Sequence, residues 1–495
     1  MHFPSDDRVP TRLRLLSLSE DVLVEVGADG DHLVAFTRWG EIRIDDASPL
    51  VFECLQRMSL GPVSVENLPG VGESFLLWKS GRDDDSCEPW YRLWRVLEQL
   101  GGCVEQSLGL DDDTEPVLSV QPVCRTARFW LPPDIEPDRP IKLSRFSGLR
   151  ACDEQLLIES PVVRCKVVLH RPPATWLIGS LCRATSIAEL ASELRLPVAV
   201  ITDVVAYLVA GGMVLLGEQG ERPRFAEDDD QRLLPWSHHD LMFHARSRMG
   251  RHGEHSGAVF PYVDRMAAPP VTKDPPPGPR FPLYQPELTE LAGRDPSLTA
   301  VVEDDRSHRR FPSRPLTAKQ LGELLFRVAR IRWTKLVNTV DGISYLVSDR
   351  PYLSTADLYE LELYLSLDRC AGLSRGSYHY DPREHALTMI NDSDPDLVEL
   401  MDAAKVAAGS TQRPAALITV TSRVARLAWM YSGIAYSTTL KHVGALQQTL
   451  QLEATAMGLA SCPVAVGDGI AADLALRLDW PAEVSVGEFI VGGRP

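Results

Sequence analysis

The chain has 495 residues, which exceeds one ordinary domain, so roughly two to four compact units are expected. Apolar residues make up 44% of it, enough to build extended cores, which excludes a chain disordered throughout. The formal net charge of −17 argues against a nucleic-acid partner, because binding phosphates requires clustered cations that release counterions.

The nine cysteines are scattered, odd in number and without a CxxC pair, so neither a disulfide framework nor a metal site such as structural zinc is expected. This usage fits a reducing cytoplasm, and the N-terminal sequence MHFPSDDRVPTRLR lacks the apolar core of a signal peptide. Residues 198–216 are apolar and nearly long enough to span a membrane, but Asp203 lies centrally and the Gly211-Gly212 pair weakens a helix. We therefore expect no membrane-spanning segment.

Residues 1–130 are expected to form a first module that resembles a winged helix. Short β-like runs come first, namely DVLVEV, HLVAFTR and EIRI. The helical patterns LVFECLQRM and WYRLWRVLEQLGG follow, and Gly101-Gly102 is a natural stop for the second of them.

A second winged-helix-like module is expected over residues 140–235. Ser186 and Glu189 have capping-box spacing at the start of the helical run IAELASEL, Pro197 breaks that run, and MVLLGE follows the next helix as the first strand of a wing. The second helix contains no Lys, Arg, Asn or Gln, the residues with which such helices read bases, so it is built for burial. Such a module suits a peptide that adds as a strand to the wing, and purely structural packing explains the pattern equally well.

Residues 236–290 are rich in proline, as in AAPPVTKDPPPGPRFPLYQP, and are expected to form an extended crossing segment rather than a packed element. Residues 291–495 begin with long helical patterns and hold the chemical motifs. The sequence contains no GxSxG elbow, HExxH helix or GxxxxGK[ST] loop, which leaves serine hydrolases, zinc proteases and P-loop enzymes unsupported.

Four segments carry these motifs. The first is DRSHRRF, residues 305–311, followed by a proline-leucine-threonine and a helical pattern. Its arginines and serine suit a phosphate and an electron-rich ring edge, which both attract cations and hydroxyl donors, although a solvated basic turn has the same composition. The second is RPYLSTADLYELELY, residues 350–364.

The third segment is LSRGSYHYDPREHAL, residues 373–387, which predicts a strand, an Asp-Pro turn and a returning strand. We assign its histidines, His379 and His385, to the fold, because a hairpin histidine is more often structural than catalytic. The fourth segment is TSRVARLAWMYSGIAY, residues 421–436, followed by a long helical pattern and a GLASCP turn.

Together these segments resemble the SagB/McbC-type FMN-dependent azoline dehydrogenases of the nitroreductase superfamily. The resemblance implies an α+β fold: a nitroreductase-like domain over residues 291–495, with a central antiparallel-rich sheet and flanking helices, behind the two winged-helix-like modules. Proteins of this type oxidise thiazoline or oxazoline rings in ribosomally made peptides. They are usually dimers with FMN at the subunit interface.

The resemblance also implies roles for single residues. Tyr431 matches the catalytic tyrosine of a lysine–tyrosine pair, and Met430 stands where the lysine belongs. The positions that match cofactor contacts are Arg306, Ser307, Arg309, Ser354, Thr355, Gln448, Gly458, Leu459 and Ser461. Where the family usually has proline, glycine, glycine and alanine, this chain has Leu353, Thr355, Ala356 and Asp357.

Met430 leaves the chemistry open. A phenol with a pKa of about 10 is a poor base at neutral pH, and a neighbouring ammonium would lower that pKa whereas a thioether cannot. Arg426 or Lys441 could replace the missing cation, or the enzyme could rely on the acidity of its substrate. The chain could also be a degenerate homologue that serves as scaffold or mixed-dimer partner, or a flavin reductase of another substrate class. The implied partners are a second copy or a paralogue, a precursor peptide and the cyclodehydratase that makes the azolines.

Overall fold

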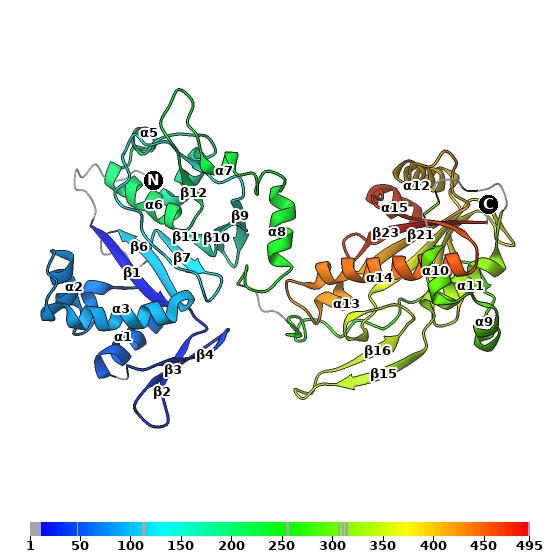
Figure 1. Ribbon diagram of the computed structural model, residues 1–495, viewed down its shortest axis with the longest axis horizontal. Helices are drawn as coiled ribbons and strands as arrows, with labels where there is room; N and C mark the ends of the chain where they lie inside the picture. Colours follow the sequence, from blue (N-terminus) through cyan, green and yellow to red (C-terminus); the bar gives the residue numbers. More distant parts are fainter. Residues whose placement is uncertain are drawn as a thin grey trace. The chain divides into compact units, whose positions relative to one another are not determined.

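The computed structural model describes residues 11–46, 48–110, 115–253, 257–304, 307–308, 311 and 315–493. The chain divides into two compact units, Met1–Glu254 and His255–Pro495 (Figure 1). Within these described ranges, no helix combines the length and the apolarity needed to cross a bilayer. The apolar stretch at 198–216 is helix α6 (Val198–Ala210) followed by the short strand β12 (Val214–Leu216).

A seven-stranded sheet in the order β5-β1-β6-β7-β11-β10-β9 organises the first unit. Its strands are β1 (Arg12–Leu18), β5 (Val63–Ser64), β6 (Val104–Leu110), β7 (Leu118–Pro122), β9 (Gly148–Cys152), β10 (Gln155–Glu159) and β11 (Cys165–Leu169). Because β7 pairs with β6 on one side and with β11 on the other, the two expected N-terminal modules share one sheet. Their winged-helix character stays a prediction.

The strand and helix patterns predicted near the N-terminus are confirmed. β2 (Leu23–Val26), β3 (Leu33–Thr37) and β4 (Gly40–Ile44) form a separate antiparallel sheet. The helices α1 (Pro49–Ser59), α2 (Gly72–Lys79) and α3 (Glu88–Leu100) follow it. Gly101 ends α3 at φ 46°, a left-handed conformation that glycine adopts without a Cβ clash.

The two helices predicted on either side of Pro197 are present, as α5 (Ile187–Leu194) and α6. β8 (Ile141–Leu143) and α4 (Pro172–Ser180) precede them, and β12, α7 (Ala226–Asp229) and α8 (His238–Arg246) follow. The Ser186 hydroxyl accepts the N–H of Glu189 and the Glu189 carboxylate accepts the N–H of Ser186, which is the predicted capping box. α6 is buried as expected, and its Tyr207 hydroxyl donates to the Ser107 carbonyl at 3.1 Å.

The second unit is built on an antiparallel sheet in the order β13-β20-β19-β17-β21-β23-β22. Its strands are β13 (Arg280–Pro282), β17 (Leu361–Leu367), β19 (Gly376–Asp381), β20 (Ala386–Asn391), β21 (Ala416–Arg423), β22 (Ala460–Val464) and β23 (Glu483–Gly492). The pairing of β19 with β20 confirms the predicted hairpin. Smaller pairs are β14 (Leu316–Thr317) with β18 (Cys370–Ala371) and β15 (Trp333–Asn338) with β16 (Ser344–Asp349).

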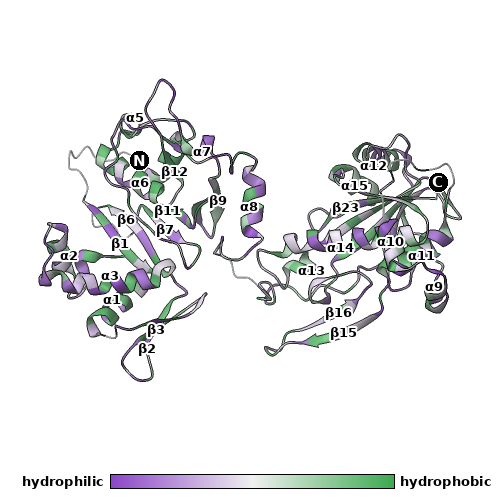
Figure 2. Cartoon of the chain, in the orientation of Figure 1, coloured by the Kyte–Doolittle hydropathy of each residue, from purple (hydrophilic) through white to green (hydrophobic). Residues whose placement is uncertain are grey.

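Helices cover both faces of this sheet. α11 (Ala318–Ala329) and α14 (Ala435–Ala456) lie on one side, and α12 (Asp394–Ala407) and α15 (Gly469–Leu476) lie on the other (Figure 1). Alternating residues of β17 divide between the two cores, since Leu363 packs towards α14 and Tyr364 towards α12 and α15. Figure 2 shows hydrophobic and hydrophilic residues mixed along α14, as expected for a helix with one buried face. The shorter helices are α9 (Leu288–Arg294), α10 (Leu298–Glu303) and α13 (Val424–Ala428).

The proline-rich segment differs from its expectation, because its later part is packed. β13 pairs with β20 at the edge of the sheet, and Val271, Thr272 and Leu283 are buried. Proline lacks the N–H that an inner strand must donate, but an edge strand needs donors on one side only. The segment therefore contributes a strand and core residues to the second unit.

Candidate active site

α14 is the helix along which the candidate site is arranged. Val443 and Leu446 lie on its buried face, within the core of the sheet. Another face is exposed at positions four residues apart, which form a continuous ridge: Tyr436, Leu440, Gly444 and Gln448. A Cβ added to Gly444 would meet nothing within 4 Å. A flat ligand can therefore approach the helix backbone here.

The loop before β17 lies at the N-terminal half of α14. The Ser354 hydroxyl accepts the N–H of Tyr359 at 3.0 Å, so this buried serine joins two positions of the loop by a hydrogen bond. Thr355 is exposed, and its N–H donates to Nε2 of His442 on α14 at 2.8 Å. Of the two predicted cofactor contacts in this loop, Thr355 is the one whose side chain is exposed.

Ser461 on β22 meets the C-terminal half of α14. Its hydroxyl donates to Oε1 of Gln451 at 3.1 Å, and its carbonyl accepts the N–H of His308 at 2.7 Å. Ser307, the residue before His308, is exposed. The structure thus brings the predicted contacts Ser307 and Ser461 to the same end of the site.

The remaining predicted cofactor positions have different outcomes. Gly458 has φ +65° at the end of α14, and the neighbouring Leu459 is a core residue. Gln448 is exposed on the ridge. Arg306 and Arg309 lie outside the described residues. His442 and Gln451 are nine residues apart on the helix, so the two ends of the site are separated by about 13 Å along the helix axis.

Tyr431 follows α13 and is half-buried, with a backbone bridge to Ala258. Burial raises the pKa of its phenol, and Tyr345 raises it further. Met430 is buried in an apolar cluster with Leu358 and Trp429. The environment of Tyr431 therefore disfavours the phenolate that a base would need.

Arg426 is not a replacement for the missing lysine. Its guanidinium is buried and donates to the backbone carbonyls of Leu358, Leu346 and Pro269. Burial lowers its pKa to about 10. Lys441 is exposed on α14, and within the described residues no hydrogen bond or ion pair joins it to Tyr431.

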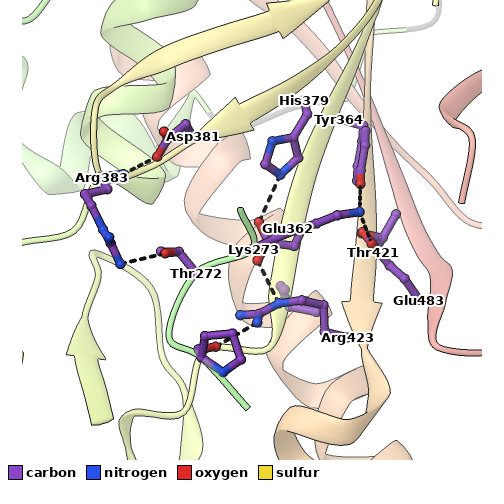
Figure 3. Close-up of polar contacts among 12 residues, drawn as sticks. Thr272, Lys273, Glu362, Tyr364, His379, Asp381, Arg383, Thr421, Arg423 and Glu483 are labelled. Atoms are coloured by element: carbon purple, nitrogen blue, oxygen red, sulfur yellow. Dashed lines mark hydrogen bonds and ion pairs between the residues drawn. The ribbon is translucent and has the colours of Figure 1, made fainter. Parts of the chain in front are cut away.

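A polar network lies at one end of the sheet, where β17, β21 and β23 meet (Figure 3). Lys273 donates to the Tyr364 hydroxyl at 2.8 Å and forms an ion pair with Glu483, which also accepts the Thr421 hydroxyl at 2.6 Å. Burial and the Glu483 carboxylate raise the pKa of Tyr364. This lysine–tyrosine contact therefore does not supply a base at neutral pH.

Glu362 is the second carboxylate of this network. It is fully buried between His379, whose Nε2 lies 3.2 Å from Oε2, and Arg423, whose Nε lies 2.8 Å from Oε1. Burial alone would raise the pKa of Glu362, but the His379 hydrogen bond and the Arg423 charge hold it at about 2. His379 thus has a structural partner, in keeping with its assignment to the fold.

The sequence motifs assigned no role to His442, Glu360 or Lys273. Two glutamates within the apolar run LYELELYL were an available signal, because a carboxylate on a buried strand requires a partner. The sequence spacing could not name those partners, since His442 is 82 residues from Glu360 and Lys273 is 210 residues from Glu483.

Comparison with known proteins agrees with this architecture. Residues 303–493 match the family model of the nitroreductase family, and residues 141–253 match that of the cyanobactin oxidase ThcOx. The chain thus joins a ThcOx-type domain to a nitroreductase-fold domain. The resemblance to the SagB/McbC-type dehydrogenases of the nitroreductase superfamily is confirmed by this combination. Both matches support an oxidoreductase, and nitroreductase-family proteins generally bind a flavin.

Solved structures with similar folds include three from bacteria. A nitroreductase-type protein of Ralstonia eutropha is 19% identical over 46% of this chain and 99% of that one, with a TM-score of 0.34. One of Anabaena variabilis is 19% identical over 52% of this chain and 47% of that one, with a TM-score of 0.35, so this chain spans about half of its length. The E. coli microcin synthetase McbBCD complex with truncated pro-MccB17 bound is 17% identical over 54% and 94%, with a TM-score of 0.33. Among curated proteins, no relative matches the chain.

The residues around α14 fit the FMN that the resemblance implies. Exposed hydroxyl-bearing side chains lie at both ends of the site, Thr355 at one end and Ser307 at the other, whereas Ser461 is buried and its hydroxyl donates to Gln451. Between them runs the exposed ridge, with glycine at its centre and apolar side chains beside it. An apolar surface suits the planar ring of FMN, and the polar residues at its two ends suit the ring edge and the phosphorylated tail.

Glu362→Gln tests whether the buried network stabilises the second unit. A depressed folded-state pKa means that the stabilisation is present above the unfolded value of 4.5 and is lost as the pH falls towards about 2. At neutral pH the substitution should lower the free energy of unfolding by about 3 kcal/mol. Urea unfolding at successively lower pH should also show a weaker acid dependence than in the native protein. Glu399→Gln, at an exposed position, is the control, and an unchanged acid dependence in Glu362→Gln would contradict the assignment.

Met430→Lys tests whether the surroundings of residue 430 are apolar. The side chain replaces a residue that is 1% exposed in an apolar cluster, so we expect a loss of more than about 2 kcal/mol of unfolding free energy. Met430→Leu, the control of similar volume, should cost less than about 1.5 kcal/mol. Equal stability of the two variants in urea unfolding would show that the lysine finds a polar partner, which contradicts the apolar environment described here.

Proposed function

We propose that the chain is an FMN-dependent dehydrogenase that oxidises azoline rings to azoles in a ribosomally made peptide. The observation that carries the proposal is the exposed ridge of α14 with Thr355 at one end and Ser307 and Ser461 at the other. A ThcOx-type domain in the same chain as the nitroreductase-family domain supports a peptide-modifying oxidase over a general flavin reductase.

The reaction removes two hydrogens from the azoline ring. Bound FMN supplies the acceptor for the hydride that leaves one ring carbon, while the protein must accept the accompanying proton. Arg306, Ser307 and Arg309 are proposed to hold the phosphate and the polar ring edge through charge-assisted hydrogen bonds. Thr355 and Gln448 are proposed to orient the ring along α14, and Ser461 to support the phosphate end.

Tyr431 is the proposed proton acceptor, but its environment does not stabilise the phenolate that would accept the proton. The neighbouring Met430 brings no charge, and Arg426 donates its hydrogen bonds to three backbone carbonyls. The raised pKa of Tyr431 therefore favours a slow enzyme that depends on the acidity of the ring proton. The same observation favours the second candidate function, a catalytically degenerate homologue that acts as scaffold or mixed-dimer partner in a peptide-modifying complex.

The first unit is proposed to hold the precursor peptide. β12 pairs with β8, and within the described residues no strand pairs with its other edge, so an extended peptide could add there as a further strand. A second copy or a paralogue is proposed to cover the ridge of α14, where Tyr436 and Leu440 are 48% and 38% exposed. A cyclodehydratase that forms the azolines would complete the assembly.

FMN titration of the native protein and of Gly444→Leu tests the site. The native protein should bind FMN near one to one. Gly444→Leu should weaken binding at least about tenfold, because the leucine side chain occupies the open space above the helix where the flavin would lie. The variant should fold normally, since its Cβ meets no neighbour and leucine favours a helix over glycine by about 1 kcal/mol. Gly179→Leu, at an equally open position on α4 in the first unit, is the matched control and should bind FMN like the native protein.

Anaerobic mixing with an azoline-containing peptide then tests the reaction. The visible absorption of bound FMN should bleach as azole forms, and Tyr431→Phe should slow the bleaching. A protein that binds FMN but is not bleached by the peptide supports the degenerate partner instead. A protein that takes up no FMN contradicts the dehydrogenase.

A further inference from the structure

His442 and Glu360 form a buried histidine–carboxylate pair, and His442 also contacts Thr355 at the surface of the site. Nδ1 of His442 lies 2.9 and 3.1 Å from the two carboxylate oxygens of Glu360. Nε2 of His442 lies 2.8 Å from the backbone nitrogen of Thr355 and 2.9 Å from its hydroxyl oxygen. His442 and Glu360 are 2% and 0% exposed, whereas Thr355 is exposed, so the chain of contacts runs from the core to the ligand side.

The contacts fix where the protons lie. A backbone N–H can only donate, so Nε2 of His442 must accept from Thr355 and the ring proton must be on Nδ1, where it is donated to Glu360. The Thr355 hydroxyl lies 2.9 Å from the same Nε2, so a hydrogen bond between these two groups is donated by the hydroxyl, which shares the lone pair with the Thr355 N–H. In this orientation the hydroxyl proton points inward, and the lone pairs of the oxygen are left for a partner on the exposed side.

The loop that carries Thr355 needs such an anchor. Ala356, Asp357 and Tyr359 have φ of 52°, 53° and 45°, in the left-handed region that residues with a Cβ adopt at a cost. The structure around a strained segment must hold it in place. Here Ser354 binds the Tyr359 N–H within the loop, and His442 binds Thr355 from α14.

We propose that Glu360 and His442 are positioning residues that hold this loop and turn the Thr355 oxygen outward as a hydrogen-bond acceptor for an N–H group of the flavin ring. The inference rests on the proposed function for the identity of the ligand. The anchoring of the loop, however, is a property of the protein alone and can be measured without a cofactor. Neither residue touches the ligand itself, and both act through Thr355.

Amide hydrogen exchange of the full chain without added FMN tests the anchor. A peptide covering residues 353–359 should exchange at least about tenfold faster in His442→Phe, which keeps a ring but removes the hydrogen bonds to Thr355 and to Glu360. His442→Gln, which retains an acceptor and a donor, should restore part of the protection. Thr455→Ala, at the far end of α14, is the control, because its hydroxyl donates to the Gln451 carbonyl of its own helix. Exchange in His442→Phe at the native rate would overturn the proposal.

FMN titration of Thr355→Val separates the two roles. Valine keeps the shape of threonine and the backbone N–H that His442 accepts, so the exchange of the loop should rise far less than in His442→Phe, while FMN binding weakens about five- to tenfold through the lost acceptor. His442→Phe should change both readouts. If His442→Phe does not fold, Thr355→Val decides, and unchanged FMN binding overturns the outward acceptor. If the native protein binds no FMN, the proposed function fails, whereas native exchange rates in the His442 variants would remove the anchor independently.

Discussion

The packing of one face of α14 on the central sheet is the constraint on which the rest of the second unit depends. Val443, Leu446 and Leu450 are buried in the core that the sheet shares with α11, so the rotation of the helix about its axis is fixed. With that rotation fixed, His442 faces the loop before β17, and the ridge from Tyr436 to Gln448 faces outward. The hydrophobic core thus determines which polar groups meet and which surface stays open.

Buried charge imposes a second requirement on the same sheet. Glu360 and Glu362 are two residues apart in the sequence, yet they have different partners. Glu360 contacts His442, whereas Glu362 contacts His379 and Arg423. Leaving either carboxylate without its partner would expose an uncompensated charge to the interior. These pairs connect α14, β19 and β21 to the segment that contains β17. The polar groups therefore specify how the helix and the strands are positioned more narrowly than the apolar core alone would.

Much of the fold could be predicted from the sequence, because its signals are local. The capping box at Ser186, the stop at Gly101 and the hairpin around residues 373–387 each depend on a few neighbouring residues. The sheet shared by the first two modules and the packing of the proline-rich segment depend on pairing between distant residues, for which the sequence alone carried no signal. The site divides in the same way: the motifs make Thr355 and Ser461 candidate cofactor contacts, but the contacts of His442 arise only when α14 packs against the loop.

The chemistry is set by what surrounds Tyr431 and by what covers α14. An aromatic and apolar surrounding holds the phenol neutral, while the open ridge offers a surface that a flat cofactor can occupy. The most direct measurement is the crystal structure of the protein reconstituted with FMN. The account predicts the flavin ring along the ridge near Thr355, with the phosphate towards Ser307 and Ser461. Flavin bound away from α14, or a ridge covered by protein with no flavin, would contradict it.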